Sequence, residues 1–210
     1  PWLYAGMFAF QMLGAIPVFL DSFARGDQLG YVAELTKPKV WLSGERAFVM
    51  ESEHQALRDI PMKINMGPCT KTYAARFEEL LETKEAAEPV PVEQEHTALI
   101  TFTTGSSGTP KGADRSHRFL AAQHYAIDSC LSYEDKDNDL PVFPIFSLNN
   151  LAAGVTTILP AINVAEPADN DPYVLYTQIK GENITTLTLN PSLLNGLNKY
   201  CLENDYTLPE

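Results

Sequence analysis

Short apolar runs that suit buried strands alternate with helical patterns along almost the whole sequence. Runs of strand length lie at residues 16–20, 39–43, 63–66, 98–103, 141–145, 156–159 and 184–189. Helical patterns lie between them, at residues 2–13, 26–36, 45–57, 73–82, 116–131, 151–154, 171–180 and 191–202. Because strands that alternate with helices of this length pair in parallel, we expect an α/β fold with a layered, largely parallel sheet flanked by helices.

The first apolar stretch, from Trp2 to Leu20, has almost the length of a membrane span. Gln11 interrupts it, and Gly14 and Pro17 would break a continuous helix. No basic segment precedes it, as a signal peptide would require. We therefore expect a buried helix followed by a buried strand, and no transmembrane segment.

An acidic segment with two prolines, residues 85–95, is typical of a surface linker. The chain has 210 residues, enough for one large domain or two small ones. We expect a first α/β portion at residues 1–88, a linker at residues 89–96 and a second α/β portion at residues 97–210.

The charge and the metal-binding residue types exclude several classes of site. The formal net charge of −12 argues against a nucleic-acid partner, because phosphate backbones are held by clusters of lysine and arginine. Cys69, Cys130 and Cys201 lie far apart, and the four histidines do not fall at metal-ligand spacing. We therefore expect no metal site and no disulfide, and a reducing, cytoplasmic location.

One loop carries the strongest chemical signal. Residues 102–112 read Phe-Thr-Thr-Gly-Ser-Ser-Gly-Thr-Pro-Lys-Gly, at the end of an apolar strand pattern. Backbone N–H groups and hydroxyls in such a loop can surround an anion, and Lys111 adds a positive charge. The pattern predicts a phosphate loop, with an ordinary flexible Ser/Gly loop as the alternative.

Two common phosphate-loop patterns do not fit. The Walker pattern needs a glycine before its lysine and a hydroxyl after it, whereas this chain has Pro110 and Gly112 at those positions. The dinucleotide pattern G-x-G-x-x-G fails because two serines separate Gly105 from Gly108.

The whole string resembles the phosphate loop of the adenylate-forming (AMP-binding) superfamily, whose pattern is aromatic-Thr-Ser/Thr-Gly-Ser/Thr-Thr-Gly-x-Pro-Lys-Gly. The loop matches this pattern except at Ser107, which keeps a hydroxyl where threonine is commoner. Weaker resemblances extend over nearly the whole chain, at residues 14–21, 31–40, 143–146 and 185–194.

Members of this superfamily, among them acyl-CoA synthetases and luciferases, activate a carboxylate with ATP and magnesium. They form an acyl-AMP, release pyrophosphate, and often transfer the acyl group to coenzyme A. The resemblance implies ATP, Mg²⁺, a fatty acyl or similar carboxylic acid, and coenzyme A as the ligands. It implies phosphate stabilisation by Lys111 as the catalytic role, and cofactor binding by Thr103, Thr104, Gly105, Ser106, Ser107, Gly108, Thr109 and Lys111.

The substrate region departs from the superfamily. Relatives carry Pro-x-x-His followed by a glycine where this chain has Ser147 and then Asn149 or Asn150. The run at residues 143–160 is more similar to the olefin-biosynthesis β-lactone synthetases, which activate long β-hydroxy acids and close the ring without coenzyme A. We therefore take Ser147 and Asn149 as candidate substrate residues; the alternative is that Ser147 only begins a core helix.

The superfamily's adenine segment, its ribose segment and its C-terminal domain with a catalytic lysine do not occur in the 210 residues. We therefore expect the chain to be a fragment of the large N-terminal domain of an adenylate-forming ligase, inactive by itself. A catalytically inactive nucleotide-binding module is the rival interpretation.

The sequence predicts structural roles for two aspartates, Asp114 and Asp139. Asp114 is expected to be a favourable charge at the N-terminus of the helix at residues 116–131. Asp139 closes an acidic cluster that begins at Glu134, next to Tyr133, and we expect this cluster to form a solvated turn.

Overall fold

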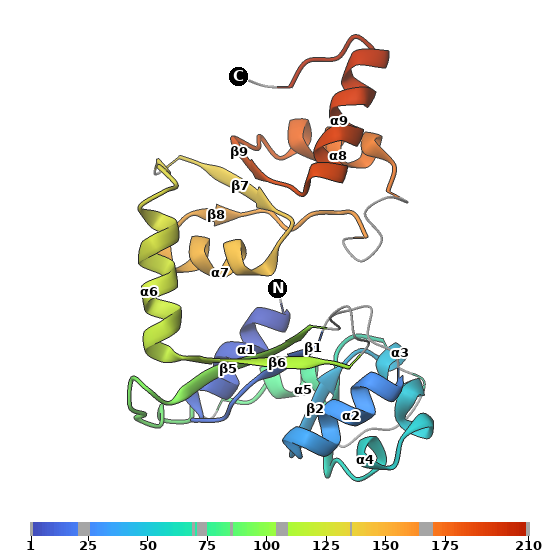
Figure 1. Ribbon diagram of the computed structural model, residues 1–210, viewed down its shortest axis with the longest axis vertical. Coiled ribbons are helices and arrows are strands. Elements are labelled where there is room, and N and C mark those ends of the chain that lie inside the picture. The colour runs from blue at the N-terminus through green and yellow to red at the C-terminus, as the bar shows by residue number, and fades with distance from the viewer. Residues whose placement is uncertain are drawn as a thin grey trace. The chain divides into compact units, whose positions relative to one another are not determined.

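A computed structural model describes residues 2–20, 26–68, 70, 75–84, 86–103, 109–134, 136–163 and 170–208. The chain forms two compact units, Pro1–Leu120 and Ala121–Glu210, and the boundary between them falls within helix α6 (His117–Asp128). Helices and strands alternate in both (Figure 1). Within the described ranges, no helix combines the length and apolarity that crossing a membrane requires.

Two small sheets organise the described part of the first unit. One contains β1 (Val18–Leu20), β5 (Thr97–Thr103) and β6 (Lys111–Ser116). In it, β1 is parallel to β5, and β5 is antiparallel to β6. The other sheet is wholly parallel and contains β2 (Val40–Ser43), β3 (Met62–Asn65) and β4 (Ala75–Arg76). The expected α/β class with mostly parallel pairing is confirmed.

The helices of the first unit pack against these sheets and one another. They are α1 (Trp2–Met12), α2 (Gly26–Thr36), α3 (Glu45–Phe48), η1 (Val49–Glu53, a 3₁₀ helix), α4 (Gln55–Arg58) and α5 (Phe77–Leu81). The side chain of Gln11 on α1 donates a hydrogen bond to the carbonyl of Ala98 on β5 at 2.7 Å. A small apolar core formed by Ala33, Leu57 and Ile60 joins α2 to α4.

The predicted continuous helix at residues 45–57 is wrong, because His54 interrupts it. The His54 backbone is extended (φ −146°, ψ 135°), and its Nδ1 accepts a hydrogen bond from the backbone N–H of Ala56 at 3.2 Å, which caps α4. The ring lies directly over Gly30 on α2, where an added Cβ would come within 2.2 Å of His54 Cγ. Apolar periodicity carries no sign of this break, since the segment has neither proline nor glycine.

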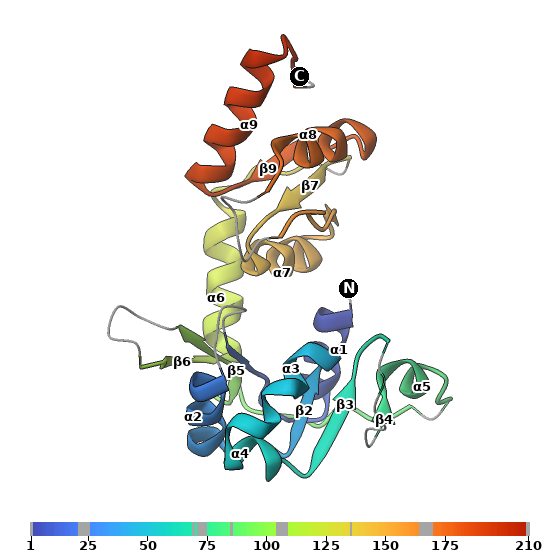
Figure 2. The same cartoon turned by 90° about the vertical axis from the view of Figure 1, so that its right-hand side faces the viewer.

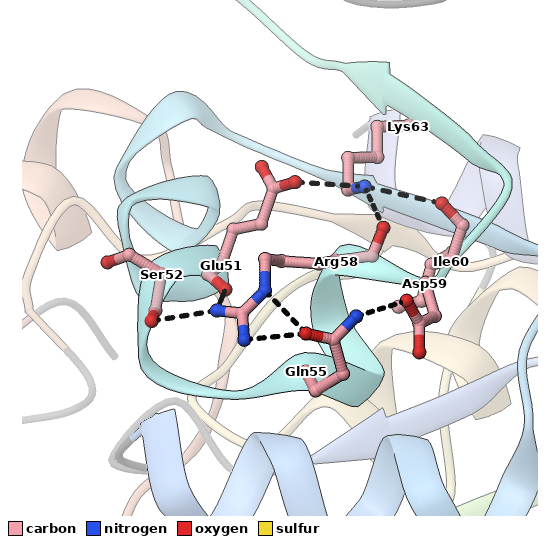
Figure 3. A network of polar contacts seen from close by, with 7 residues as sticks. All are labelled: Glu51, Ser52, Gln55, Arg58, Asp59, Ile60 and Lys63. Atoms are coloured by element: carbon pink, nitrogen blue, oxygen red, sulfur yellow. Dashed lines mark hydrogen bonds and ion pairs between the residues drawn. The ribbon is translucent and has the colours of Figure 1, made fainter.

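A polar network around Arg58 holds the broken segment together (Figure 3). The guanidinium donates to the Ser52 carbonyl at 2.9 Å and to the Gln55 side-chain oxygen at 3.0 and 2.8 Å. Lys63 on β3 forms an ion pair with Glu51 at 3.2 Å and donates to the Arg58 carbonyl at 3.2 Å. These bonds satisfy carbonyls at the ends of two short helices and tie them to β3.

The second unit contains a parallel sheet with one apolar face. Its strands are β8 (Thr156–Thr157), β7 (Asn138–Pro141) and β9 (Thr186–Thr188), with β7 in the centre. Helix α7 (Pro144–Ala153) lies on the opposite side of the sheet from α8 (Pro172–Gly181) and α9 (Pro191–Glu203) (Figures 1 and 2). The apolar core on the side of α8 and α9 contains Leu140, Val142, Leu175, Tyr176, Ile179, Ile184, Leu193, Leu197 and Cys201.

The predicted strand at residues 141–145 is wrong. Strand β7 ends at Pro141, and α7 begins at Pro144, so the predicted helix at residues 151–154 is only the last part of α7. Proline suits the first turn of a helix, where its missing N–H is not needed. An apolar run of five residues does not by itself distinguish a buried strand from a helix start.

A strand that the sequence patterns did not predict lies between the predicted phosphate loop and the helix that follows it. Residues 111–116 form β6, and α6 starts at His117. Asp114 therefore lies in a strand, where its Oδ2 accepts a hydrogen bond from the Thr97 hydroxyl at 3.1 Å. The interpretation of Asp114 as a helix N-terminal charge is wrong.

Candidate functional site

The predicted phosphate loop joins two antiparallel strands. Strand β5 ends at Thr103 and β6 begins at Lys111, and these two residues are cross-strand partners. Thr103, Thr109 and Lys111 are all exposed. The middle of the predicted loop, residues 104–108, lies outside the described residues. The structure thus brings Thr103 and Lys111 together at the base of the loop, and their phosphate-binding role stays a prediction.

The first and last residues of the loop motif have a packing role. Phe102 on β5 is directly opposite Gly112 on β6 and is only 4% exposed. A Cβ built on Gly112 would lie 2.9 Å from two carbons of the Phe102 ring, closer than real Cβ atoms approach. The aromatic residue and the glycine therefore fix the two strands that hold the loop.

We expect Gly112→Ala to lower the free energy of unfolding by about 1–3 kcal/mol, because the new methyl group must displace the buried Phe102 ring. Urea unfolding monitored by circular dichroism measures this change. The matched control is Gly181→Ala, since a Cβ at Gly181 meets no atom within 4 Å. Equal stabilities of the two variants would contradict the packing role of Gly112.

The candidate substrate residues lie on α7, which directs polar side chains inward. Ser147 is 2% exposed and Asn149 is 3% exposed. The Nδ1 atom of His124 on α6 lies 2.9 Å from Asn149 Oδ1. Asn149 Nδ2 is buried and has no hydrogen-bond partner among the described residues. Ser147 is therefore buried within α7, which begins at Pro144, and its substrate role stays a prediction; the amide nitrogen of Asn149 is buried without a partner in the described structure.

Asp139 is a buried carboxylate that the sequence interpretation missed. It is 1% exposed and sits in β7, so the expected solvated turn is wrong at this residue. Its Oδ2 accepts hydrogen bonds from Asn150 Nδ2 at 2.7 Å and from the Tyr133 hydroxyl at 3.3 Å. Its Oδ1 accepts one from the Thr186 hydroxyl at 2.7 Å. The sequence carries no local signal of this burial, because an aspartate at the end of an acidic run is usually exposed to solvent.

Asp139 belongs to a polar layer that crosses the face of the sheet beneath α7. It pairs in register with Thr157 on β8 and Thr186 on β9, so these side chains share one face. Asn150 contributes from α7 and is fully buried. The Asn150 Oδ1 and Thr157 Oγ1 atoms are buried without a hydrogen-bond partner in the described structure. This side of the sheet therefore has unused hydrogen-bonding capacity, whereas the opposite side is apolar.

The environment of Tyr133 raises the pKa of its phenol from 10.0 to about 12, first through burial and then through the neighbouring Asp139 carboxylate. The phenol therefore ionises near pH 10 in the unfolded chain and near pH 12 in the folded one. Its contribution to stability is complete below pH 10 and is lost as the pH rises through 12.

Between pH 9 and pH 11, the free energy of unfolding should fall more in the wild type than in Tyr133→Phe, by at most about 1 kcal/mol because solvent screens this partly exposed phenol. Urea unfolding of both proteins at the two pH values gives this difference, with every other titrating group common to both. An equal fall in the two proteins would show that the Tyr133 pKa is not raised.

No group of three or more His, Cys, Asp or Glu side chains gathers at metal-binding distance in the described part of the chain. Cys130 is exposed and Cys201 is buried, and both are free thiols; Cys69 lies outside the described residues. The predicted loop residues belong to the first compact unit, and Ser147 and Asn149 belong to the second.

Curated relatives share sequence with between about half and nearly all of the chain. The chain is 30% identical to an olefin beta-lactone synthetase of Stenotrophomonas maltophilia (strain K279a) over 204 residues. This alignment covers 95% of the chain and 37% of the relative. The chain is 32% identical over 126 residues to a sulfoacetate–CoA ligase of Cupriavidus necator, which covers 59% of this chain and 23% of the relative. The chain thus spans well under half the length of these relatives.

Solved structures share the fold. The Mycobacterium smegmatis MbtA apo structure matches with a TM-score of 0.80 at 18% identity, covering 95% of this chain and 38% of that chain. A luciferase-like enzyme from the mealworm Zophobas morio matches with a TM-score of 0.76 at 19% identity, covering 96% of this chain and 48% of that chain. The family model described as AMP-binding enzyme matches residues 1–208. The chain therefore belongs to the family of AMP-binding enzymes.

Proposed function

We propose that the protein carrying this chain activates a carboxylic acid with ATP, forming an acyl-AMP and releasing pyrophosphate. The observation that carries this proposal is the AMP-binding family match over residues 1–208, which includes the loop at residues 102–112. The match to the AMP-binding family supports ATP as the energy source, and the cytoplasm is the proposed compartment. Magnesium enters bound to ATP, as part of the substrate.

In this proposal the loop holds the β- and γ-phosphates. Negative charge grows on the departing pyrophosphate as the carboxylate attacks the α-phosphate. Lys111 is exposed at the base of the loop beside Thr103, so its ammonium is free to approach a phosphate in solvent. In this proposal the hydroxyls and N–H groups of residues 103–109 are further donors to the phosphates, and donors that are preorganised stabilise developing charge strongly.

The acid is proposed to be a fatty acid or a similar carboxylic acid, and two acyl acceptors compete. Transfer to coenzyme A is supported by the CoA-ligase relatives, whose matches cover about half of this chain. Ring closure to a β-lactone is supported by the olefin beta-lactone synthetases, one of which aligns with 95% of the chain. The wider alignment favours the lactone, and therefore a β-hydroxy acid as substrate.

One assay separates the two acceptors. The full-length protein is given ATP, magnesium, coenzyme A and a long-chain 3-hydroxy acid, and the products are separated by liquid chromatography and mass spectrometry. A β-lactone with AMP supports ring closure, and a hydroxyacyl-CoA with AMP supports transfer to coenzyme A. Tight ATP binding without AMP formation from any acid would instead support the rival, an inactive nucleotide-binding module.

A further inference from the structure

His124 and Asn149 form a pair with chemistry that the adenylation step does not use. His124 is partly exposed on α6, and Asn149 is buried on α7. Asn149 Oδ1 lies 2.9 Å from His124 Nδ1. An amide oxygen can only accept a hydrogen bond, so Nδ1 carries the hydrogen. The other ring nitrogen of the neutral imidazole, Nε2, is then a hydrogen-bond acceptor and a base.

The amide nitrogen of Asn149 adds a donor to this pair. Asn149 Nδ2 is buried and has no hydrogen-bond partner among the described residues. Leaving a buried donor unpaired destabilises the protein, so the position favours a ligand that brings an acceptor oxygen. The pair therefore contains one acceptor, Nε2, and one donor without a partner in the described structure, Nδ2. A hydroxyl group, which both donates and accepts, is the complement of such a pair.

We propose that His124 and Asn149 recognise a hydroxyl group of the acid substrate, and that His124 accepts its proton when this hydroxyl becomes the acyl acceptor. This inference rests on the proposed function, because the acid must first be adenylated. In ring closure the hydroxyl oxygen bonds to the acyl carbon, and the bond from that carbon to the AMP oxygen breaks. AMP leaves with the electron pair of that bond, and the hydroxyl proton moves to His124 Nε2.

Asn149 acts as a positioning residue in this step. Its Oδ1 holds the proton on Nδ1 and fixes the ring, which keeps the lone pair of Nε2 available for the hydroxyl. The arrangement of nucleophile, base and orienting group is the one that activates hydroxyl nucleophiles in other enzymes, although here the nucleophile belongs to the substrate.

The test uses the full-length protein and two acids of equal chain length, with and without a 3-hydroxyl group. In the wild type, kcat/KM for ATP–pyrophosphate exchange should be about tenfold or more higher with the hydroxy acid. His124→Phe and Asn149→Leu should remove this preference. In a single turnover, conversion of the hydroxyacyl-adenylate to lactone and AMP should slow by about 10²–10⁴-fold in His124→Phe.

Two further variants distinguish loss of the orientation of the His124 ring from a general loss of folded protein. Asn149→Asp keeps an oxygen facing Nδ1 and should recover part of the lactone rate that Asn149→Leu loses. Tyr125→Phe alters the adjacent residue, which is 71% exposed, and should keep both the preference and the rate. His124→Gln is measured beside His124→Phe, and circular dichroism identifies the variants that are folded.

The outcomes distinguish this inference from the proposed function. Lactone formation at the wild-type rate in folded His124 variants overturns the inference, and so does a wild type with no preference for the hydroxy acid. In both cases pyrophosphate exchange with either acid leaves the proposed function standing. A wild type that exchanges pyrophosphate with neither acid contradicts the proposed function itself.

Discussion

Replacing Lys111 with alanine in the full-length protein is expected to lower kcat/KM for ATP–pyrophosphate exchange by about 10²–10³-fold, the usual loss when one preorganised charge-stabilising donor is removed. The effect should fall on the rate of adenylation, because the positive charge is needed most when charge has accumulated on the leaving pyrophosphate. Lys111 is exposed at the base of the loop, so the substitution leaves no buried group unpaired. Stability should therefore change little.

The matched control is Lys199→Ala, which removes a lysine that is 76% exposed on α9. It changes the net charge of the protein by the same amount, so a general electrostatic effect on ATP binding would appear in both variants. Lys111→Arg keeps a positive charge and should fall between Lys111→Ala and the wild type. Exchange by Lys111→Ala within threefold of the wild-type rate would show that Lys111 does not stabilise the pyrophosphate.

Replacing Asp139 with alanine is expected to lower the free energy of unfolding by about 3–5 kcal/mol, because several buried or partly buried donors lose their common acceptor. The carboxylate accepts hydrogen bonds from Tyr133, Asn150 and Thr186, which come from a loop, α7 and β9. Its removal leaves these three donors unpaired in or near the interior, and each unpaired buried donor is costly. The loss should be visible as a large fall in the urea midpoint with an unchanged slope.

Asp128→Ala is the control for this prediction, because Asp128 is an exposed carboxylate on α6. Its removal should change stability by less than about 0.5 kcal/mol. Asp139→Asn keeps one acceptor oxygen but places an NH₂ group among donors, so its loss should lie between those of the wild type and Asp139→Ala. A midpoint for Asp139→Ala equal to that of Asp128→Ala would mean that the buried network contributes nothing to stability.

The helices whose ends were predicted correctly have capping residues that can be recognised in the sequence. Helices α8 and α9 each have a proline in the first turn, and the Asp171 and Asn190 side chains before them accept hydrogen bonds from backbone N–H groups. These signals depend only on neighbouring residues, so they are readable without the fold. The observed α8 and α9, Pro172–Gly181 and Pro191–Glu203, start and end within one residue of the predicted ranges.

The elements that were missed are decided by distant partners. Strand β6 reads Lys-Gly-Ala-Asp-Arg-Ser, which has no apolar alternation, and it forms because β5 pairs with it. The break at His54 depends on Gly30, which lies more than twenty residues earlier. The pairing of β1 with β5 joins Val18 to Ile100 and has no local signal at all.

The residues of the candidate site also differ in whether the sequence alone could predict them. The phosphate loop could be proposed from the sequence because the family pattern is a run of adjacent residues, from Phe102 to Gly112, and its phosphate-binding role stays a prediction. The buried layer around Asp139 was not, because an aspartate in an acidic run is usually solvated, and only the parallel neighbours of β7 bury it. The contact of His124 with Asn149 likewise depends on the packing of α6 against α7.

The most direct test is carboxylate-dependent ATP–pyrophosphate exchange by the full-length protein, measured without coenzyme A. Long-chain acids with and without a 3-hydroxyl group are supplied one at a time, with labelled pyrophosphate. We predict label in ATP only when an acid is present, because the acyl-AMP must form reversibly before any acceptor is used. Exchange that is absent with every acid, in a folded protein that binds ATP, would contradict acyl-adenylate formation as the function of this protein.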